Sequence, residues 1–178
     1  QYVTATYNNN REYLDKIKIK YKNNLKIIKL NINNKNELDK LTKKINNYNN
    51  IFFYQTPKIL SKNLNIFNKK YYNELEYFYL ETVKIIFSKI KVKINCFIPS
   101  TAYLNSKIDG FQEYIRAKTE MENFCKSVNK KKGLIKNSIY RLPPFLTDQN
   151  INILQNQKYK NFNFLLNKLE DFINNAKN

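Results

Sequence analysis

The sequence predicts an α/β protein with a doubly wound parallel sheet, and three observations support this. Segments of strand type and helix type alternate along the 178 residues almost without exception. Parallel strands need a crossover connection, which is normally a helix, so the alternation indicates a parallel sheet with helices on both faces. The sequence shows no internal repeat and no interdomain linker. A single domain over residues 1–178 is therefore expected.

In the first half of the chain, the strand segments are rich in β-branched and aromatic residues, and the helix segments repeat apolar residues at helical spacing. The three asparagines at 8–10 favour a turn, and Asn36 is the expected N-cap of the second helix. In order, we expect a strand at 2–7, a helix at 11–22, a strand at 25–32, a helix at 34–48, and a strand at 50–56 that Pro57 ends.

The second half continues the same alternation with longer elements. Its first helix is crowded with aromatic residues, which indicates a core or packing face, and its second helix is opened by Asp109 and Gly110. In order, we expect a helix at 69–89, a strand at 92–100, a helix at 109–128, a strand at 134–143 and a helix at 159–176. In doubly wound folds ligands bind beyond the carboxyl ends of the strands, so the residues that follow each strand are the candidate site residues.

The net charge of +18, from 32 Lys and Arg against 14 Asp and Glu, is the first clue to partners. Such a balance can indicate nucleic acid or an acidic membrane. However, the abundant residues (Asn, Lys, Ile, Tyr and Phe) are those with A/T-rich codons, and the positive residues are scattered along the chain. An A/T-rich genome explains the lysines more simply. A basic nucleic-acid-binding domain is therefore kept only as an alternative, and no membrane partner is expected.

Histidine is absent, which excludes Ser-His-Asp and Cys-His catalysis and ordinary His-ligated metal sites. The spacing of Cys96 and Cys125 indicates neither a metal site nor a disulfide scaffold, so we expect reduced cysteines and no metal. No signal peptide or membrane-spanning run is visible, and a cytoplasmic location is expected. The chain begins with Gln1 and almost at once enters a strand, which suggests a piece of something longer.

Three Tyr-x-x-x-Lys patterns occur, whereas the composition predicts about two by chance. Only Tyr114 and Lys118 lie inside a clear helix, where residues four apart share one face. Only this pair also follows a strand that ends in hydroxyl residues, Ser100 and Thr101. A phenol has a pKa near ~10, and a neighbouring ammonium would lower that pKa. Such a tyrosine could exchange a proton with a carbonyl oxygen, and a strand-end hydroxyl could orient the same oxygen.

At this point the sequence resembles the short-chain dehydrogenase/reductase family, because "STAYLNSKIDGFQEYIRAK" (residues 100–118) matches its Ser…Tyr-x-x-x-Lys site. The resemblance implies a Rossmann-like fold and hydride transfer between NADPH and a small carbonyl or alcohol substrate. It implies that Tyr114 is the acid/base, that Lys118 holds the nicotinamide ribose and that Ser100 orients the substrate. Thr101, thirteen residues before Tyr114, could fill the hydroxyl role in place of Ser100.

The resemblance extends to other strand ends, where it implies further cofactor contacts. "YRLPPFLTDQ" (residues 140–149) resembles the segment that borders the nicotinamide, and "TATYNNNRE" (residues 4–12) resembles the strand end that selects NAD or NADP. No carboxylate precedes Glu12 there and an arginine is close, so NADP is favoured and NAD is the alternative. The implied cofactor-binding residues, besides Tyr114 and Lys118, are Tyr7, Asn8, Arg11, Asn31, Ile32, Thr56, Pro143 and Thr147.

Two departures from the family pattern keep other functions open. The Gly-rich turn that follows the first strand in this family is not in the sequence, so the first βα unit is expected to be missing from this chain. The Asn that the family carries in its fourth helix is also missing, and Tyr79 is a candidate replacement. A non-catalytic relative that serves as a structural or interaction subunit is therefore the main alternative. The family resemblance also implies a homo-oligomer.

Overall fold

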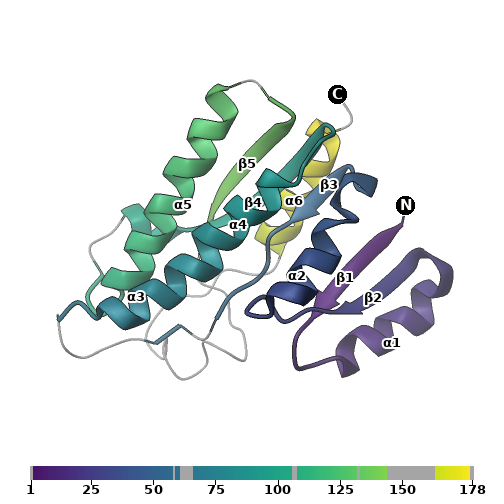
Figure 1. Cartoon of the computed structure of the whole chain (residues 1–178), viewed down its shortest axis with the longest axis horizontal. Helices are drawn as coiled ribbons and strands as arrows, with labels where there is room; N and C mark the ends of the chain where they lie inside the picture. Colours follow the sequence, from purple (N-terminus) through teal and green to yellow (C-terminus); the bar gives the residue numbers. More distant parts are fainter. Residues whose placement is uncertain are drawn as a thin grey trace. The chain divides into compact units, whose positions relative to one another are not determined.

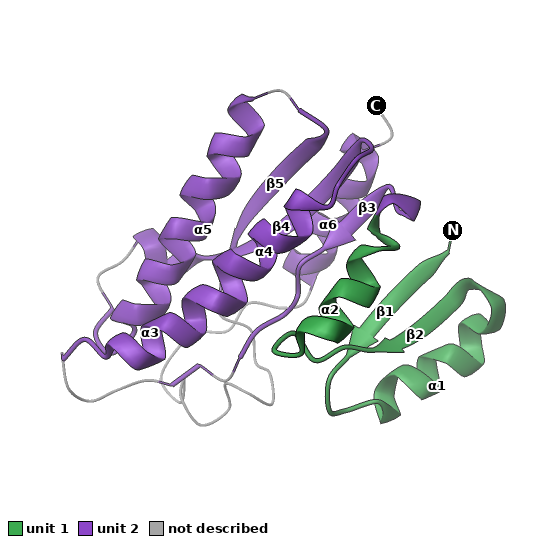
Figure 2. Ribbon diagram, viewed as in Figure 1, with its two compact units in different colours: residues 1–45 green, residues 46–178 purple. Residues whose placement is uncertain are grey.

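The computed structural model describes residues 2–57, 59–60, 66–105, 108–131, 133–143 and 163–176. The chain forms two compact units, residues 1–45 and 46–178 (Figure 2). Each unit is built from parallel strands joined by helices, and each is described by itself. The α/β class with parallel strands predicted from the sequence is confirmed.

The first unit is a βαβ unit followed by a helix (Figure 1). Strands β1 (Val3–Tyr7) and β2 (Leu25–Lys29) pair in parallel from Val3 opposite Leu25 to Tyr7 opposite Lys29. Helix α1 (Glu12–Tyr21) and a short 3₁₀ turn, η1 (Lys22–Asn24), make the crossover that parallel pairing requires. Helix α2 (Lys35–Thr42) follows β2 and leads to a second 3₁₀ turn, η2 (Ile45–Asn47), where the two units join.

The start of α2 corrects one sequence-based prediction. Asn34, not Asn36, is the N-cap, because its side-chain oxygen accepts the backbone N–H groups of Asn36 and Glu37 at 3.0 and 3.3 Å. The Glu37 carboxylate in turn accepts the backbone N–H of Asn31 at 2.6 Å. Backbone donors at the start of a helix have no intrahelical partner, so these side chains satisfy groups that the helix leaves open.

The second unit contains a three-stranded parallel sheet in the order β3-β4-β5. Its described elements are β3 (Asn50–Phe52), α3 (Lys69–Glu76), a π-helical turn η3 (Tyr77–Glu81), α4 (Thr82–Ser88), β4 (Ile94–Thr101), a 3₁₀ turn η4 (Ala102–Asn105), α5 (Gln112–Lys130), β5 (Ile135–Leu142) and α6 (Asn163–Asn175). The strands and α-helices correspond to segments predicted from the sequence, although β3 is shorter than expected, whereas η4 lies in a stretch predicted as a connection. Within the described residues the strands pair in two groups, β1-β2 and β3-β4-β5.

Helices cover both faces of the β3-β4-β5 sheet, with α4 and α5 on one face and α6 on the other (Figure 1). On the α6 face, the Phe97 ring of β4 stacks on Tyr140 of β5 at 4.6 Å and meets the edge of Phe172 of α6 at 5.5 Å. Cys96 and Ile98 are wholly buried within β4. Burial of these apolar side chains is the main stabilising contribution, at roughly 25 cal/mol per Å².

The predicted helix at 69–89 is not one regular α-helix. The turn at Tyr77–Glu81 is π-helical, because the backbone N–H of Thr82 bonds to the carbonyl of Tyr77, five residues earlier. The buried Thr82 hydroxyl donates to the same carbonyl at 2.9 Å. Single π turns inside α-helices are frequent at functional sites.

Helix α5 is fastened to the outer edge of β5 by Asn129. Its side-chain amide donates to the carbonyl of Asn137 at 2.8 Å, and its side-chain oxygen accepts the N–H of Asn137 at 2.8 Å. The Asn137 side chain in turn donates to the carbonyl of Cys125 at 3.1 Å. The three bonds fix α5 along the strand, and with it the side chains on the inner face of the helix.

Candidate active site

Helix α5 carries the predicted Tyr and Lys one turn apart at the carboxyl end of β4. The helix follows Gly110, whose φ of 80° lies in the left-handed region that glycine adopts without strain. The buried carboxylate of Glu113 in the first turn accepts the backbone N–H of Asn68 at 2.5 Å. The starts of α3 and α5 are thereby tied together next to Tyr114.

The ammonium of Lys118 is buried, with only 6% of the residue exposed. Its Nζ donates to the carbonyl of Pro99 in β4 at 2.8 Å and lies 3.8 Å from the ring centroid of Tyr79. The Tyr114 ring centroid is 6.0 Å from the same Nζ. Burial lowers the pKa of Lys118 to about 7, although Cys125 and Glu122 act in the opposite direction.

The Tyr114 ring packs at the edge of an aromatic cluster that includes Tyr103 and Phe111. Its centroid lies 5.7 Å from that of Tyr79 and 6.5 Å from that of Tyr103, both in edge-on geometry. Burial raises the pKa of Tyr114 to about 12, and a hydrogen bond with the Thr101 hydroxyl lowers it only in part. The phenol is therefore protonated at neutral pH.

The expectation that Lys118 lowers the pKa of Tyr114 is thus wrong. The two side chains do share a face of α5, as predicted. However, the Lys118 ammonium lies against the Pro99 carbonyl and the Tyr79 ring. It is not among the groups that shift the pKa of the Tyr114 phenol, because desolvation dominates that site.

The two candidate hydroxyls at the end of β4 have different surroundings. Thr101 is buried, its Oγ1 accepts the backbone N–H of Tyr103 at 3.2 Å, and it hydrogen-bonds to Tyr114. Ser100 is also buried but lies beside the Glu122 carboxylate, whose pKa it helps to lower. Among the described residues its hydroxyl has no hydrogen-bond partner of ordinary geometry. The geometry therefore favours Thr101, the alternative, as the hydroxyl that works with Tyr114.

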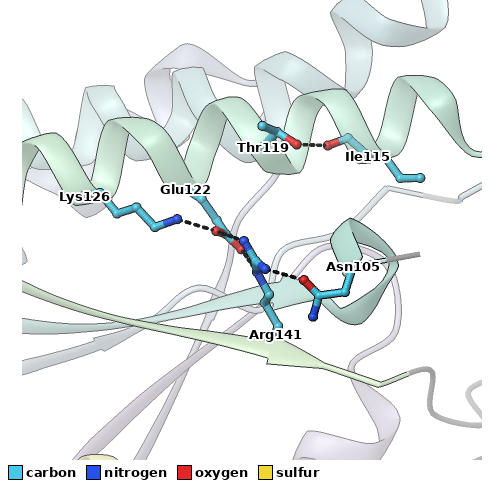
Figure 3. A network of polar contacts seen from close by, with 6 residues as sticks. All are labelled: Asn105, Ile115, Thr119, Glu122, Lys126 and Arg141. Atoms are coloured by element: carbon cyan, nitrogen blue, oxygen red, sulfur yellow. Dashed lines mark hydrogen bonds and ion pairs between the residues drawn. The ribbon is translucent and has the colours of Figure 1, made fainter. Parts of the chain in front are cut away.

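Glu122, one turn beyond Lys118, is the centre of a polar network that sequence reasoning did not identify (Figure 3). Arg141 of β5 donates to both of its carboxylate oxygens, from Nε at 2.9 Å and from Nη2 at 2.8 Å. Lys126 donates to Oε2 at 2.9 Å, and Arg141 Nη1 donates to the Asn105 side chain at 2.5 Å. Burial opposes ionisation of Glu122, yet the bonds from Arg141 and Lys126 and the nearby Ser100 hydroxyl hold its pKa at about 2.

The network joins α5, the carboxyl end of β5 and η4 through bidentate pairing, which fixes orientation as well as distance. The sequence feature that could have indicated this network is the scarcity of arginine. The chain has only three, and Arg141 stands opposite Ser100 in the β4–β5 register.

Thr56, beyond the end of β3, is brought into the same region by Tyr79. The two hydroxyl oxygens are 2.7 Å apart, and Thr56 also donates to the carbonyl of Pro57 at 3.2 Å. Burial raises the pKa of Tyr79 well above its usual value. The structure thus brings together Thr56, Tyr79, Lys118, Tyr114 and Thr101 within the second unit.

The predicted cofactor residues of the first unit lie near the carboxyl ends of β1 and β2. Tyr7 ends β1, Asn8 follows it and is exposed, and the guanidinium of Arg11 lies 5.9 Å from the Tyr7 ring centroid. Arg11 also pairs with Asp15 at 3.0 Å in an exposed ion pair. Part of the hydrogen-bonding capacity of the Arg11 guanidinium is therefore already used by Asp15.

Asn31 and Ile32 follow β2, and Asn31 has a local structural role. Its side-chain oxygen accepts the N–H of Asn33 at 3.0 Å, within the turn that leads to Asn34 and α2. At the other end of the chain, Pro143 directly follows β5. Thr147 lies outside the described residues. The cofactor roles of all these residues stay predictions.

Three further findings concern the described part of the chain. Cys96 and Cys125 are both free and buried, and burial raises the pKa of both thiols. No cluster of three carboxylate or thiol side chains there could hold a metal ion. Nor is any helix there long and apolar enough to cross a bilayer.

Comparisons with protein families and with curated proteins find no match to this chain. Among solved structures, a short-chain dehydrogenase from Streptomyces avermitilis matches with a TM-score of 0.71 and 13% identity, over 83% of this chain and 58% of that one. A short-chain dehydrogenase/reductase from Saccharomyces cerevisiae gives 0.73 and 14%, over 94% and 70%. The alternative dihydrofolate reductase FolM from Brucella suis, in complex with NADP, gives 0.78 and 10%, over 99% and 79%. The chain therefore has the Rossmann-like α/β fold of the short-chain dehydrogenases/reductases.

Proposed function

We propose that this protein is an NADP-dependent oxidoreductase that interconverts a small carbonyl compound and its alcohol. The observation that carries the proposal is the meeting of three groups at the carboxyl end of β4. They are a protonated phenol, Tyr114; a strand-end hydroxyl bonded to it, Thr101; and the Lys118 amine on the same helix face. This edge of a parallel sheet is where ligands bind in doubly wound folds.

The residues at this edge fit the nicotinamide-ribose end of the cofactor by the chemistry of their donors. An ammonium has three N–H donors, and Lys118 uses one of them on the Pro99 carbonyl. A donor remains for ribose hydroxyls, beside the phenol of Tyr114. Brucella FolM was solved with NADP. Together with Arg11 near the end of β1, this supports NADP, and NAD is the alternative.

The proposed roles follow from the protonation states. When bound, NADPH supplies a hydride to the carbonyl carbon. Tyr114 holds its proton at neutral pH, because burial raises its pKa to about 12, and it can donate that proton to the carbonyl oxygen. The carbonyl thereby becomes an alcohol and Tyr114 a phenolate, which takes a proton from solvent. Thr101 orients the phenol through its hydrogen bond.

Substitution of Tyr114 by Phe tests this proposal, with Tyr13→Phe on the exposed face of α1 as the matched control. NADPH binding is measured by nicotinamide fluorescence, and turnover by NADPH oxidation with a panel of aldehydes and ketones. We expect the native chain and both variants to bind NADPH, and Tyr114→Phe to lose turnover by roughly 10²–10⁴-fold.

Three results would count against the proposal. Equal turnover in the native protein and the Tyr114→Phe variant would remove Tyr114 from the chemistry. A native chain that folds but does not bind NADPH or NADH would favour the non-catalytic alternative. Binding of DNA or RNA with a steep dependence on salt would favour the nucleic-acid alternative.

The remaining features are proposed on the strength of the sequence. We propose a cytoplasmic protein that acts on a small molecule and assembles with copies of itself. Light scattering of the purified chain measures the last of these directly.

A further inference from the structure

The Lys118 ammonium is buried without a carboxylate in contact. Among the described residues no Asp or Glu oxygen lies within ion-pair distance of its Nζ, and the one hydrogen-bond acceptor is the Pro99 carbonyl at 2.8 Å. A buried charge is unfavourable unless another group compensates it. The Tyr79 ring, with its centroid 3.8 Å from Nζ, supplies that compensation as a cation–π contact.

Three contacts fix the Tyr79 ring in this position. The π turn at Tyr77–Glu81 contains Tyr79 and is held closed by the two bonds from Thr82 to the Tyr77 carbonyl. The Tyr79 hydroxyl is 2.7 Å from that of Thr56, beyond the end of β3. The ring also meets that of Tyr114 edge-on, and Tyr79 is only 2% exposed. A ring held at both ends has no freedom to leave the ammonium.

We propose that Tyr79 is a positioning residue whose ring holds the Lys118 ammonium at the carboxyl end of β4 and keeps it charged for a bound ligand. The role of Lys118 in ligand binding rests on the proposed function, whereas the position of its amine against the Tyr79 ring does not. The Thr56 hydroxyl serves to aim the ring. The Tyr79 hydroxyl acts only by orienting the ring, because the ring face, not the hydroxyl oxygen, contacts the Lys118 ammonium.

Several groups besides Tyr79 face the amine and bear on its charge. Glu122 and Cys125 of α5 favour the charged form, and the phenol of Tyr114 lies on the same helix. The Pro99 carbonyl of β4 favours it too, by accepting a hydrogen bond. Burial opposes all of these and lowers the pKa of Lys118 to about 7. The ring therefore acts on a group that titrates in the physiological range.

The test is the NMR spectrum of protein labelled with ¹³C at the lysine Cε, followed over pH. The Lys118 signal is assigned by its absence from the Lys118→Met variant. Because the amine lies over an aromatic face, we expect its Cε protons to resonate upfield of those of the exposed lysines. We also expect this signal to titrate near pH 7, well below the reference lysine pKa of ~10.4. A native signal at the ordinary position, or one that titrates with the exposed lysines, would overturn the proposal.

Two variants separate the ring from the hydroxyl. Tyr79→Phe loses the contact with Thr56 but keeps the ring face, which the π turn and the Tyr114 ring still hold, so the upfield shift and the titration near pH 7 should persist. Tyr79→Leu keeps an apolar side chain but removes the face, so the upfield shift should vanish and the Lys118 pKa should fall by about one unit. A Lys118 pKa that is unchanged or raised in Tyr79→Leu would overturn the proposal.

The spectra require no nucleotide, so they test whether the Lys118 amine lies against the Tyr79 ring even if the chain binds no cofactor. Where NADPH does bind, its affinity should fall as pH rises through the Lys118 pKa. In Tyr79→Leu that fall should occur about one unit lower in pH, and in Tyr79→Phe at the native position. The same dependence of NADPH affinity on pH in all three proteins would contradict the role of Tyr79 in ligand binding. The position of the amine would then be decided by the spectra alone.

Discussion

At the scale of single residues, the buried amine of Lys118 opposes folding over a wide range of pH. Its pKa is about 7 in the folded protein and 10.5 in its ordinary state. Below pH 7 the amine is charged in both states, so the unfavourable burial of the charge is fully present. As pH rises from 7 to about 10.5, the folded amine is neutral while the unfolded one still holds its proton, and stability increases.

Lys118→Met should therefore stabilise the fold, and more at low pH than at high pH. We expect its advantage in free energy of unfolding over the native protein to shrink by roughly 3–4 kcal/mol between pH 6 and pH 10. Urea unfolding at the two pH values measures this. The matched control is Lys16→Met, because Lys16 is an exposed partner of Glu12 and should show no such trend. An advantage that is constant with pH would mean that Lys118 is not desolvated.

The buried carboxylate of Glu122 has the opposite dependence on pH. Its pKa is about 2 in the folded protein, below the ordinary value of 4.5. Its ionised contacts therefore contribute stability that is present above pH 4.5 and is lost as pH falls toward 2. Arg141 supplies two of those contacts.

Arg141→Ala should lower the free energy of unfolding at pH 7 by about 2–3 kcal/mol, because it leaves a buried carboxylate with Lys126 as its one cationic partner among the described residues. The difference from the native protein should narrow below pH 4. Arg11→Ala is the control, since its ion pair with Asp15 is exposed and should contribute little to stability. Equal losses in free energy of unfolding for the two substitutions, measured by chemical denaturation, would contradict a stabilising role of the Arg141–Glu122 pair.

At the scale of elements, the ends and interruptions of helices depend on single side chains. The predicted N-cap of α2 was two residues late, because Asn34 and Asn36 are both asparagines preceded by polar residues. Composition alone does not distinguish them. The structure does, since Asn34 has extended backbone angles and accepts two backbone N–H groups, whereas Asn36 lies inside the helix.

Asn34→Ala should lower the free energy of unfolding by about 1 kcal/mol, as the loss of an N-cap typically does. Asn36→Ala should change it by less than about 0.5 kcal/mol, because alanine is the better helix former at an interior position. Thermal unfolding of the two variants in parallel decides between the positions. A larger loss in Asn36→Ala would restore the prediction made from the sequence.

The π turn illustrates what periodicity cannot show. Residues 69–89 have helical spacing throughout, so the sequence predicts one helix. The extra residue of the π turn is accompanied by a local bond from the Thr82 hydroxyl and by the burial of Tyr79, and the second of these is a tertiary effect. That local irregularity sets the position of the Tyr79 ring.

At the scale of the whole molecule, the alternation of strands and helices was sufficient to predict the α/β class and nearly all elements. The grouping of strands was not, because pairing between strands far apart in the sequence leaves no trace in periodicity. Of the site, the proximity of Tyr114 and Lys118 followed from helix geometry alone. Their protonation states did not, because desolvation depends on side chains from α5, β4 and η3 that pack only in the folded chain.

The clasp between Asn129 and β5 has a consequence for association. In the described part of the chain β5 is an edge strand, and an edge exposes main-chain groups that another polypeptide can use for β-augmentation. The Asn129 carboxamide already satisfies both main-chain groups of Asn137, near the middle of that border. An incoming strand would have to displace this amide first, so edge-to-edge aggregation is obstructed at Asn137.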